Sequence, residues 1–168
     1  MNIDPGSRER LHFLLRVVRK ESAHLEGTDE RLFREPFTRD TAARLASDPE
    51  LAERVDAFST RFARLQDTLG DKLLPMLLQA LGETTGAVID NLDRAERLGL
   101  IESSDQWMML RKLRNQMVDD YIEDPAVLAD ALQTAHDHVA SLTRAAEQMI
   151  LEINRRGWGE NADPADRG

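Results

Sequence analysis

The sequence predicts an all-α protein, an antiparallel four-helix bundle with an extra N-terminal helix. Aromatic residues make up only 5% of the chain, and Ala, Leu, Glu, Arg and Asp are abundant, a composition that favours helices over sheet. Apolar residues recur at steps of three and four along several long stretches, and short turn-forming segments join these stretches. Helices joined by short turns pack most simply side by side in opposite directions.

A length of 168 residues fits one domain with a substantial core. We expect residues 1–156 to form that helical domain and residues 157–168, rich in Gly, Asp, Asn and Pro, to be a disordered tail despite Trp158. Cysteine is absent, which excludes a disulfide framework and a thiolate metal site. No stretch approaches the roughly 20 apolar residues of a membrane span, so we expect a soluble cytoplasmic protein that binds no membrane.

The charge balance is 22 basic against 31 acidic residues, a formal net charge of −9. This excess of negative charge argues against broad electrostatic attachment to nucleic acid or to an anionic membrane. Any contact with RNA therefore has to come from a local basic groove.

The first helix is expected over residues 7–25, with Ser7 as its N-cap. Turn residues then indicate a linker over residues 27–39, whose three large apolar side chains should pack at the edge of the bundle: Leu32, Phe33 and Phe37. A short helix over residues 40–46 follows.

A long helix is predicted over residues 49–81. Ser47 is its expected cap and Pro49 stands in the first turn, where a missing N–H costs least. The apolar series runs at steps of three and four without a gap. Pro75 lies inside this helix and predicts a kink near residues 71–74.

The next helix should begin at Thr84 or Thr85 and close at Gly99. The helix after it should open at Ser103 or Ser104 and run to about residue 123. A last, single helix is expected over residues 125–155.

Chemically able side chains are concentrated on the helix that opens near Ser103. Beside its apolar stripe lie six of them: Arg111, Arg114, Asn115, Asp119, Asp120 and Tyr121. Seven residues separate Arg114 from Tyr121, so the two nearly coincide on one face, with Asn115 alongside. The five-residue step from Arg114 to Asp119 turns about 140°. The alternative is that Tyr121 is a bundle-edge residue and Arg114 is its cation–π or salt-bridge neighbour.

A second polar row follows the long helix: Arg61, Arg64, Asp67, Thr68 and Asp71. Its spacing suits a solvated charged face, and the alternative is a dimer seam or the rim of a nucleotide groove. Glu21 with His24 is interpreted as a surface pair, because the second copy and the further carboxylates that a di-iron site needs are missing. His136 and His138 are also interpreted as surface residues, because side chains two apart on a helix point to different sides. Common nucleotide-binding and hydrolase motifs are absent, and we expect no metal and no cofactor.

Three segments resemble one family. Arg114-Asn115 followed by Tyr121 resembles the R-N-x-x-x-H-x-Y signature of HEPN proteins, the small all-helical partners of minimal nucleotidyltransferases in toxin–antitoxin pairs. Residues 61–73 and 91–101 resemble the helices that precede this signature, so the resemblance extends over residues 52–121. Asp119 stands where the family has its histidine.

The resemblance implies a homodimer in which Arg114 and Asp119 occupy the catalytic positions of a metal-independent ribonuclease groove. It further implies that Tyr121 is the tyrosine to which the nucleotidyltransferase transfers AMP, and that four other residues line the binding surface: Arg61, Arg64, Arg111 and Asn115. Histidine has a pKa of about 6.5, whereas aspartate starts from about 3.9 and ordinarily remains an anion that repels phosphate. The substitution at Asp119 therefore argues against ribonuclease activity.

Three functions remain as hypotheses. The first is an interaction protein that binds a minimal nucleotidyltransferase and has lost nuclease chemistry. The second is a metal-independent endoribonuclease toxin in which Asp119 replaces the histidine. The third is a helical module that binds nucleotides or RNA without cutting.

Overall fold

The computed structural model describes residues 3–118 and 123–159. Within these ranges the chain forms helices and no β-strand, which confirms the all-α class. The elements in chain order are α1 (Pro5–Leu32), α2 (Arg39–Ala43), the 3₁₀ helix η1 (Arg44–Ala46), α3 (Pro49–Asp67), the π-helical segment η2 (Thr68–Leu73), α4 (Leu74–Ala80), α5 (Val88–Arg97), α6 (Ser104–Val118), α7 (Pro125–Asp137) and α8 (Val139–Arg155).

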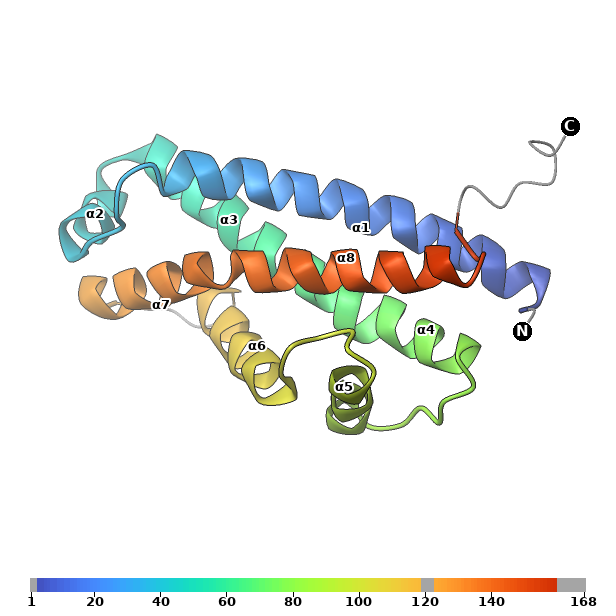
Figure 1. Ribbon diagram of the computed structural model, residues 1–168. Helices are drawn as coiled ribbons and strands as arrows, with labels where there is room; N and C mark the ends of the chain where they lie inside the picture. Colours follow the sequence, from blue (N-terminus) through green and yellow to red (C-terminus); the bar gives the residue numbers. More distant parts are fainter. Residues whose placement is uncertain (1–2, 119–122, 160–168) are drawn as a thin grey trace, which may run out of the picture.

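The longest helices define the shape of the molecule (Figure 1). α1 and α8 run side by side in opposite directions along its length, and α3 crosses them before continuing through η2 into α4. α5 and α6 pack against the α3–α4 arm on the lower side of the view, and α2 packs against α7 at one end. α3 thus has α1 on one side and α6 on another, which places it at the centre of the polar contacts described below.

One continuous core joins the helices. Its fully buried side chains come from most of the long elements, with Phe58 and Phe62 of α3 among the largest. Leucines on α1, on η2 and on α4 complete its central part: Leu11, Leu15, Leu69, Leu73, Leu74 and Leu77. Burial on this scale accounts for the stability of a bundle whose helices are individually ordinary in propensity.

The first helix is longer than predicted. It begins with Asp4 as its N-cap, which accepts a hydrogen bond from the Ser7 amide at 3.0 Å, so Ser7 is not the cap. It also continues through Gly27 and Thr28 to Leu32, where a linker was expected. Thr28 and Leu32 are buried, and this burial outweighs the roughly 1 kcal/mol helix penalty of a glycine.

The long helix predicted over residues 49–81 has its predicted break, but the break is a π-helical segment. Asp48, rather than Ser47, caps α3 by accepting from the Leu51 amide at 3.1 Å. The expected kink before Pro75 is the π-helical segment η2, in which the Leu74 amide bonds to the Leu69 carbonyl. Proline has no N–H and its ring crowds the carbonyl four residues back, so the wider turn relieves a clash that a regular helix would retain.

The starts of α5 and α6 differ in how far local sequence determines them. No threonine caps α5; instead the Asn91 side chain bonds both to the Gly86 amide at 3.0 Å and to the Gly86 carbonyl at 3.3 Å. Gly99 has a φ of 75°, the left-handed conformation predicted for closing α5. Ser103 caps α6 as expected, its hydroxyl accepting from the Gln106 amide at 3.1 Å.

The last predicted helix is two helices, α7 and α8, separated at His138. The backbone of His138 leaves helical geometry at φ −111° and ψ 5°, and its Nδ1 lies 2.8 Å from the Thr134 carbonyl. His136 is also no bare surface residue, because its Nδ1 lies 2.6 Å from Asp29 and its ring stacks on Phe33 at 4.2 Å. These contacts fasten α7 to the end of α1.

The end of the chain is more ordered than predicted at Trp158. Gly157 takes a φ of 74°, and the Trp158 amide bonds to the Ile153 carbonyl at 3.0 Å, so the chain turns back after α8. The Trp158 side chain is only 1% exposed. The bundle therefore includes Trp158, and residues 160–168 of the predicted tail lie outside the described residues.

None of the described helices combines the length and the apolar character that crossing a membrane requires.

A candidate polar site between α3 and α6

Three of the predicted site residues lie on described turns of α6: Arg111, Arg114 and Asn115. Asp119 and Tyr121, the predicted catalytic and modification positions, belong to residues 119–122 and lie outside the described residues. The site is therefore built from the C-terminal half of α6 and from the helices that it contacts.

α6 approaches η2 closely because of a glycine. A Cβ atom placed on Gly70 would lie 3.2 Å from Nε1 of Trp107, a tighter approach than side chains usually make. Trp107 is 5% exposed and packs in the core together with Leu110 and Leu113 of the same helix. The small residue on η2 thus lets the indole of α6 lie directly against the backbone.

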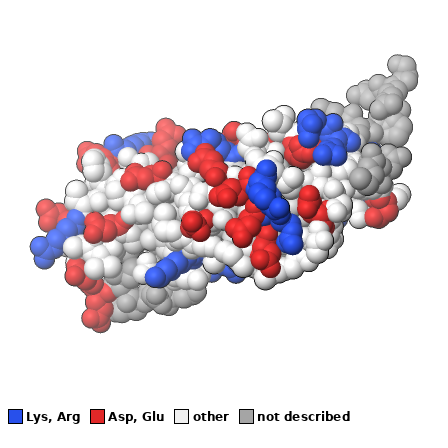
Figure 2. Space-filling view, turned by 60° about the horizontal axis from the view of Figure 1, so that its bottom comes forward, with Lys and Arg blue, Asp and Glu red and all other residues white. Residues whose placement is uncertain are grey.

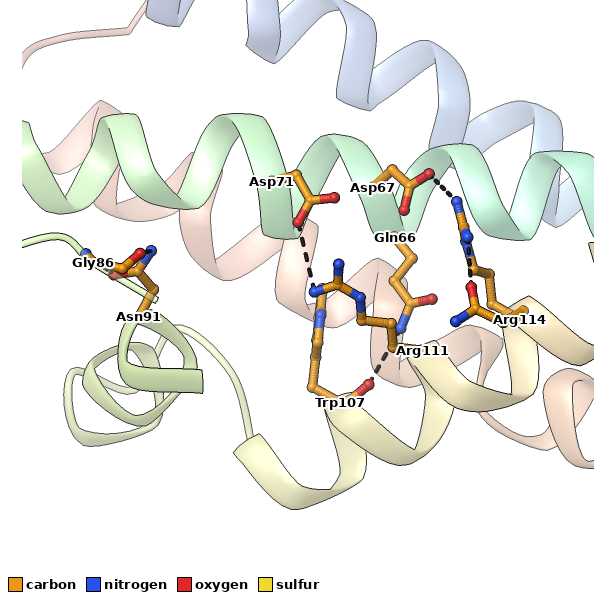
Figure 3. A network of polar contacts seen from close by, with 9 residues as sticks. Gln66, Asp67, Asp71, Gly86, Asn91, Trp107, Arg111 and Arg114 are labelled. Atoms are coloured by element: carbon orange, nitrogen blue, oxygen red, sulfur yellow. Dashed lines mark hydrogen bonds and ion pairs between the residues drawn. The ribbon is translucent and has the colours of Figure 1, made fainter. Parts of the chain in front are cut away.

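A buried amide adds a polar link at the same crossing. Gln66 is 2% exposed, and its Nε2 donates a hydrogen bond to the Trp107 carbonyl at 3.3 Å (Figure 3). Its Oε1 is buried and has no hydrogen-bond partner among the described residues. A buried acceptor without a hydrogen-bond partner is uncommon in folded proteins. The crossing of α6 with α3 and η2 is therefore a candidate polar site.

Two arginines of α6 face two carboxylates across this crossing (Figure 3). Arg114 forms an ion pair with Asp67, and Arg111 lies 3.9 Å from Asp71. The later arginine pairs with the earlier aspartate, which is the order that two antiparallel helices produce. Because 111 and 114 are three residues apart and 67 and 71 are four apart, each pair stands on one face of its helix.

Arg114 is the more enclosed of the two arginines. Its side chain is 22% exposed, against 36% for Arg111. One terminal nitrogen serves Asp67 and the other donates to Asn115 Oδ1 at 2.6 Å, while Nε is buried without a partner among the described residues. Most of the donors that could grip an incoming phosphate are therefore already engaged or enclosed.

Arg61 and Arg64 do not join this cluster. Arg61 reaches α1, where its Nη1 donates to the Thr28 hydroxyl and to the His24 carbonyl. Arg64 is exposed, and its charge acts on the Glu21 carboxyl. The structure thus brings together Arg111, Arg114 and Asn115, and separates from them the two arginines that the resemblance placed on the same binding surface.

Glu21 forms a separate contact between α1 and η2. Its Oε1 accepts a hydrogen bond from the Thr68 hydroxyl at 3.1 Å, so it is not a simple surface residue. Burial raises the pKa of the Glu21 carboxyl, and the Thr68 hydrogen bond and the charges of Lys72 and Arg64 oppose that rise.

The surface around α5 and α6 carries both signs of charge. On the face shown in Figure 2, basic side chains stand among acidic ones, and the described residues there form no broad basic patch. Among the described residues, no cluster of three or more His, Asp or Glu side chains could hold a metal ion. The candidate site is thus a neutralised polar crossing.

The sequence pattern identifies the arginines but not their partners. The spacing of Asp67 and Asp71 is typical of a solvated face, and the pattern does not single out Gln66, Gly70 or Trp107. A usable signal was present, because the spacing from Asp67 to Asp71 matches that from Arg111 to Arg114 closely enough for two facing helices.

No protein-family model matches this chain, and neither the curated proteins nor the solved structures contain a significant match to it.

Proposed function

We propose that the protein is a HEPN-type partner of a minimal nucleotidyltransferase, a non-cleaving component of a toxin–antitoxin pair. The ion pair between Arg114 and Asp67 is the main observation in support of the proposed lack of RNA cleavage. The arginine of the HEPN-like signature is held by a carboxylate of its own chain, and the neighbouring Arg111 is likewise opposite a carboxylate, Asp71.

The electrostatics of the crossing support this reading. A ribonuclease that works without metal needs an unpaired cation for the phosphate and a group that exchanges protons near neutral pH. Here the cation is paired, and the histidine position of the signature holds Asp119, whose ordinary pKa is about 3.9. The paired arginine and the aspartate at the histidine position both disfavour RNA cleavage.

The same proposal includes the finer architecture. The helices would form a HEPN-like four-helix bundle and a two-fold dimer, with Arg114 and Tyr121 facing a groove shared by the protomers. An isologous interface would place two copies of the α6 edge near each other. The nucleotidyltransferase would bind at that groove and transfer AMP from ATP to the phenol oxygen of Tyr121, with release of pyrophosphate and of the phenol proton.

Two measurements test the partner. Co-expression with a minimal nucleotidyltransferase encoded beside the gene should give a complex that co-purifies, and intact mass should show the addition of AMP on the wild-type chain but not on Tyr121→Phe. Absence of any stable complex would remove the partner. A complex without added mass would remove only the modification.

A ribonuclease assay tests the loss of chemistry. We expect no metal-independent cleavage by the unaltered protein, some cleavage by Asp119→His, and more when Asp67→Asn is added, because that change releases Arg114. Strong cleavage by the unaltered chain that disappears in Arg114→Ala would instead establish the toxin function.

A further inference from the structure

A separate, solvent-open cavity of about 500 Å³ lies between the C-terminal half of α1 and residues 50–61 of α3. Its polar lining consists of three arginines, two glutamates and one threonine: Arg31, Arg54, Arg61, Glu50, Glu53 and Thr28. None of these residues takes part in the crossing of α3 with α6. The cavity is therefore a second place where arginines of this acidic protein converge.

Arg61 is held at this cavity by hydrogen bonds that use only part of its guanidinium. Its Nη1 donates to the Thr28 hydroxyl and, at 3.4 Å, to the His24 carbonyl. Thr28 is 3% exposed, so this anchor is fixed by the packing of α1. A guanidinium carries N–H donors on all three nitrogens, and the bonds of Arg61 occupy Nη1 alone. Nε and Nη2 remain for a ligand.

Arg31 lies on α1, three residues after Thr28. A Cβ atom on Gly27 would be 3.8 Å from both terminal nitrogens of Arg31, so the guanidinium folds back along the helix over the glycine. Among the residues that the structure describes, no carboxylate lies within ion-pair distance of Arg31 or Arg61.

Arg54 contributes the third cation. Its ion pair with Glu50, at 3.8 Å, joins side chains that are 52% and 85% exposed, and pairs of this kind contribute little. Three arginines against two glutamates leave a formal surplus of one positive charge at the cavity, in a chain whose net charge is −9. Neither Glu50 nor Glu53 lies within ion-pair distance of Arg31 or Arg61 in the described part of the chain.

We propose that this cavity binds the diphosphate group of a small molecule. Guanidinium groups bind phosphate oxygens through paired, charge-assisted hydrogen bonds, and an anion between Arg31 and Arg61 would relieve their mutual repulsion. The two glutamates at the α3 side of the cavity repel an extended polyanion, so a compact ligand suits the site better than an RNA strand.

Titration calorimetry of the full chain with inorganic pyrophosphate tests the proposal. We expect one site per chain, weaker binding at higher salt, and a loss of affinity of about tenfold or more in Arg31→Ala. Arg31 is exposed, so its replacement should leave folding intact, which circular dichroism checks. Arg16→Ala, which removes an exposed arginine of α1 away from the cavity, is the matched control and should bind like the unaltered chain.

Further titrations with a charge variant and with other anions test which ligand the cavity prefers. Glu53→Gln should tighten pyrophosphate binding by removing a repelling charge. A nucleoside diphosphate should bind at least as well as pyrophosphate, and sulfate should bind more weakly. No pyrophosphate binding at millimolar concentration, equal binding of sulfate, equal loss in Arg16→Ala, or binding of an RNA oligonucleotide without binding of pyrophosphate would each overturn the proposal.

Discussion

Arginines lie on two sides of α3, in opposite electrostatic surroundings. On the side of α6, Arg114 and Arg111 stand opposite Asp67 and Asp71. On the side of α1, Arg61 stands opposite a hydroxyl and a backbone carbonyl, which hold it in place without cancelling its charge. What the neighbouring helix presents thus decides whether an arginine is available to a ligand.

The largest expected effect concerns the packing that creates the α6 side. Trp107→Ala should lower the free energy of unfolding by about 3 to 5 kcal/mol, because it removes a buried indole and leaves a cavity against Gly70. Urea denaturation measures this change. Met109→Ala, on an exposed position of the same helix, is the control and should change stability little.

The ion pairs of the α6 side should differ in strength. Asp67→Ala should cost about 1 to 2 kcal/mol, because it leaves the enclosed Arg114 guanidinium without its carboxylate. Asp71→Ala should cost less than about 0.5 kcal/mol, since its pair with Arg111 is longer and more exposed. Double-mutant cycles with Arg114→Ala and Arg111→Ala measure the two couplings, and equal values would contradict the ranking.

The hydrogen bond between Thr28 and Arg61 can be removed by a single substitution. Thr28→Val keeps the shape of a buried side chain and deletes the hydroxyl that accepts from Arg61, so it should cost about 1 kcal/mol. It should also weaken pyrophosphate binding, because Arg61 would no longer be held toward the cavity. Unchanged binding in a folded Thr28→Val variant would show that this anchor is irrelevant to the ligand.

The smallest expected effect is a dependence on pH at Glu21. Burial raises the pKa of this carboxyl in the folded protein, so between the unfolded and folded pKa values the folded state binds the proton more tightly. The contribution of Glu21 to stability therefore increases as the pH falls through the folded pKa and is lost as the pH rises. Glu21→Gln should be more stable than the unaltered chain near neutral pH. Denaturation curves from pH 7 to about 4 should show the difference shrinking.

Local sequence determined much of the secondary structure. The apolar period predicted most of the helices, Pro75 predicted a break just before itself, Gly99 predicted the end of α5, and the pair Ser103 and Ser104 predicted the start of α6. These features depend on the backbone chemistry of single residues and their immediate neighbours, such as a missing N–H, a left-handed φ or a capping hydroxyl. They need no information from the rest of the chain.

Tertiary packing decided the features that local chemistry leaves undetermined. Gly27 and Thr28 are helical because the turn that they form is buried against the bundle, and Trp158 is ordered because its indole fills the core. Propensity differences of a few tenths to about 1 kcal/mol are smaller than the energy of burying one large side chain. A pattern read along the chain therefore errs where long-range burial opposes it.

The candidate site divides in the same way. The sequence by itself placed Arg111, Arg114 and Asn115 on one helix and Asp67 with Asp71 on another. Only the register between α6 and η2, which depends on the close approach at Gly70, decided that the arginines meet those aspartates. Only the packing of α1 on α3 decided that Arg61 faces the other way, because the facing partner of a helical residue is a property of two helices and not of one.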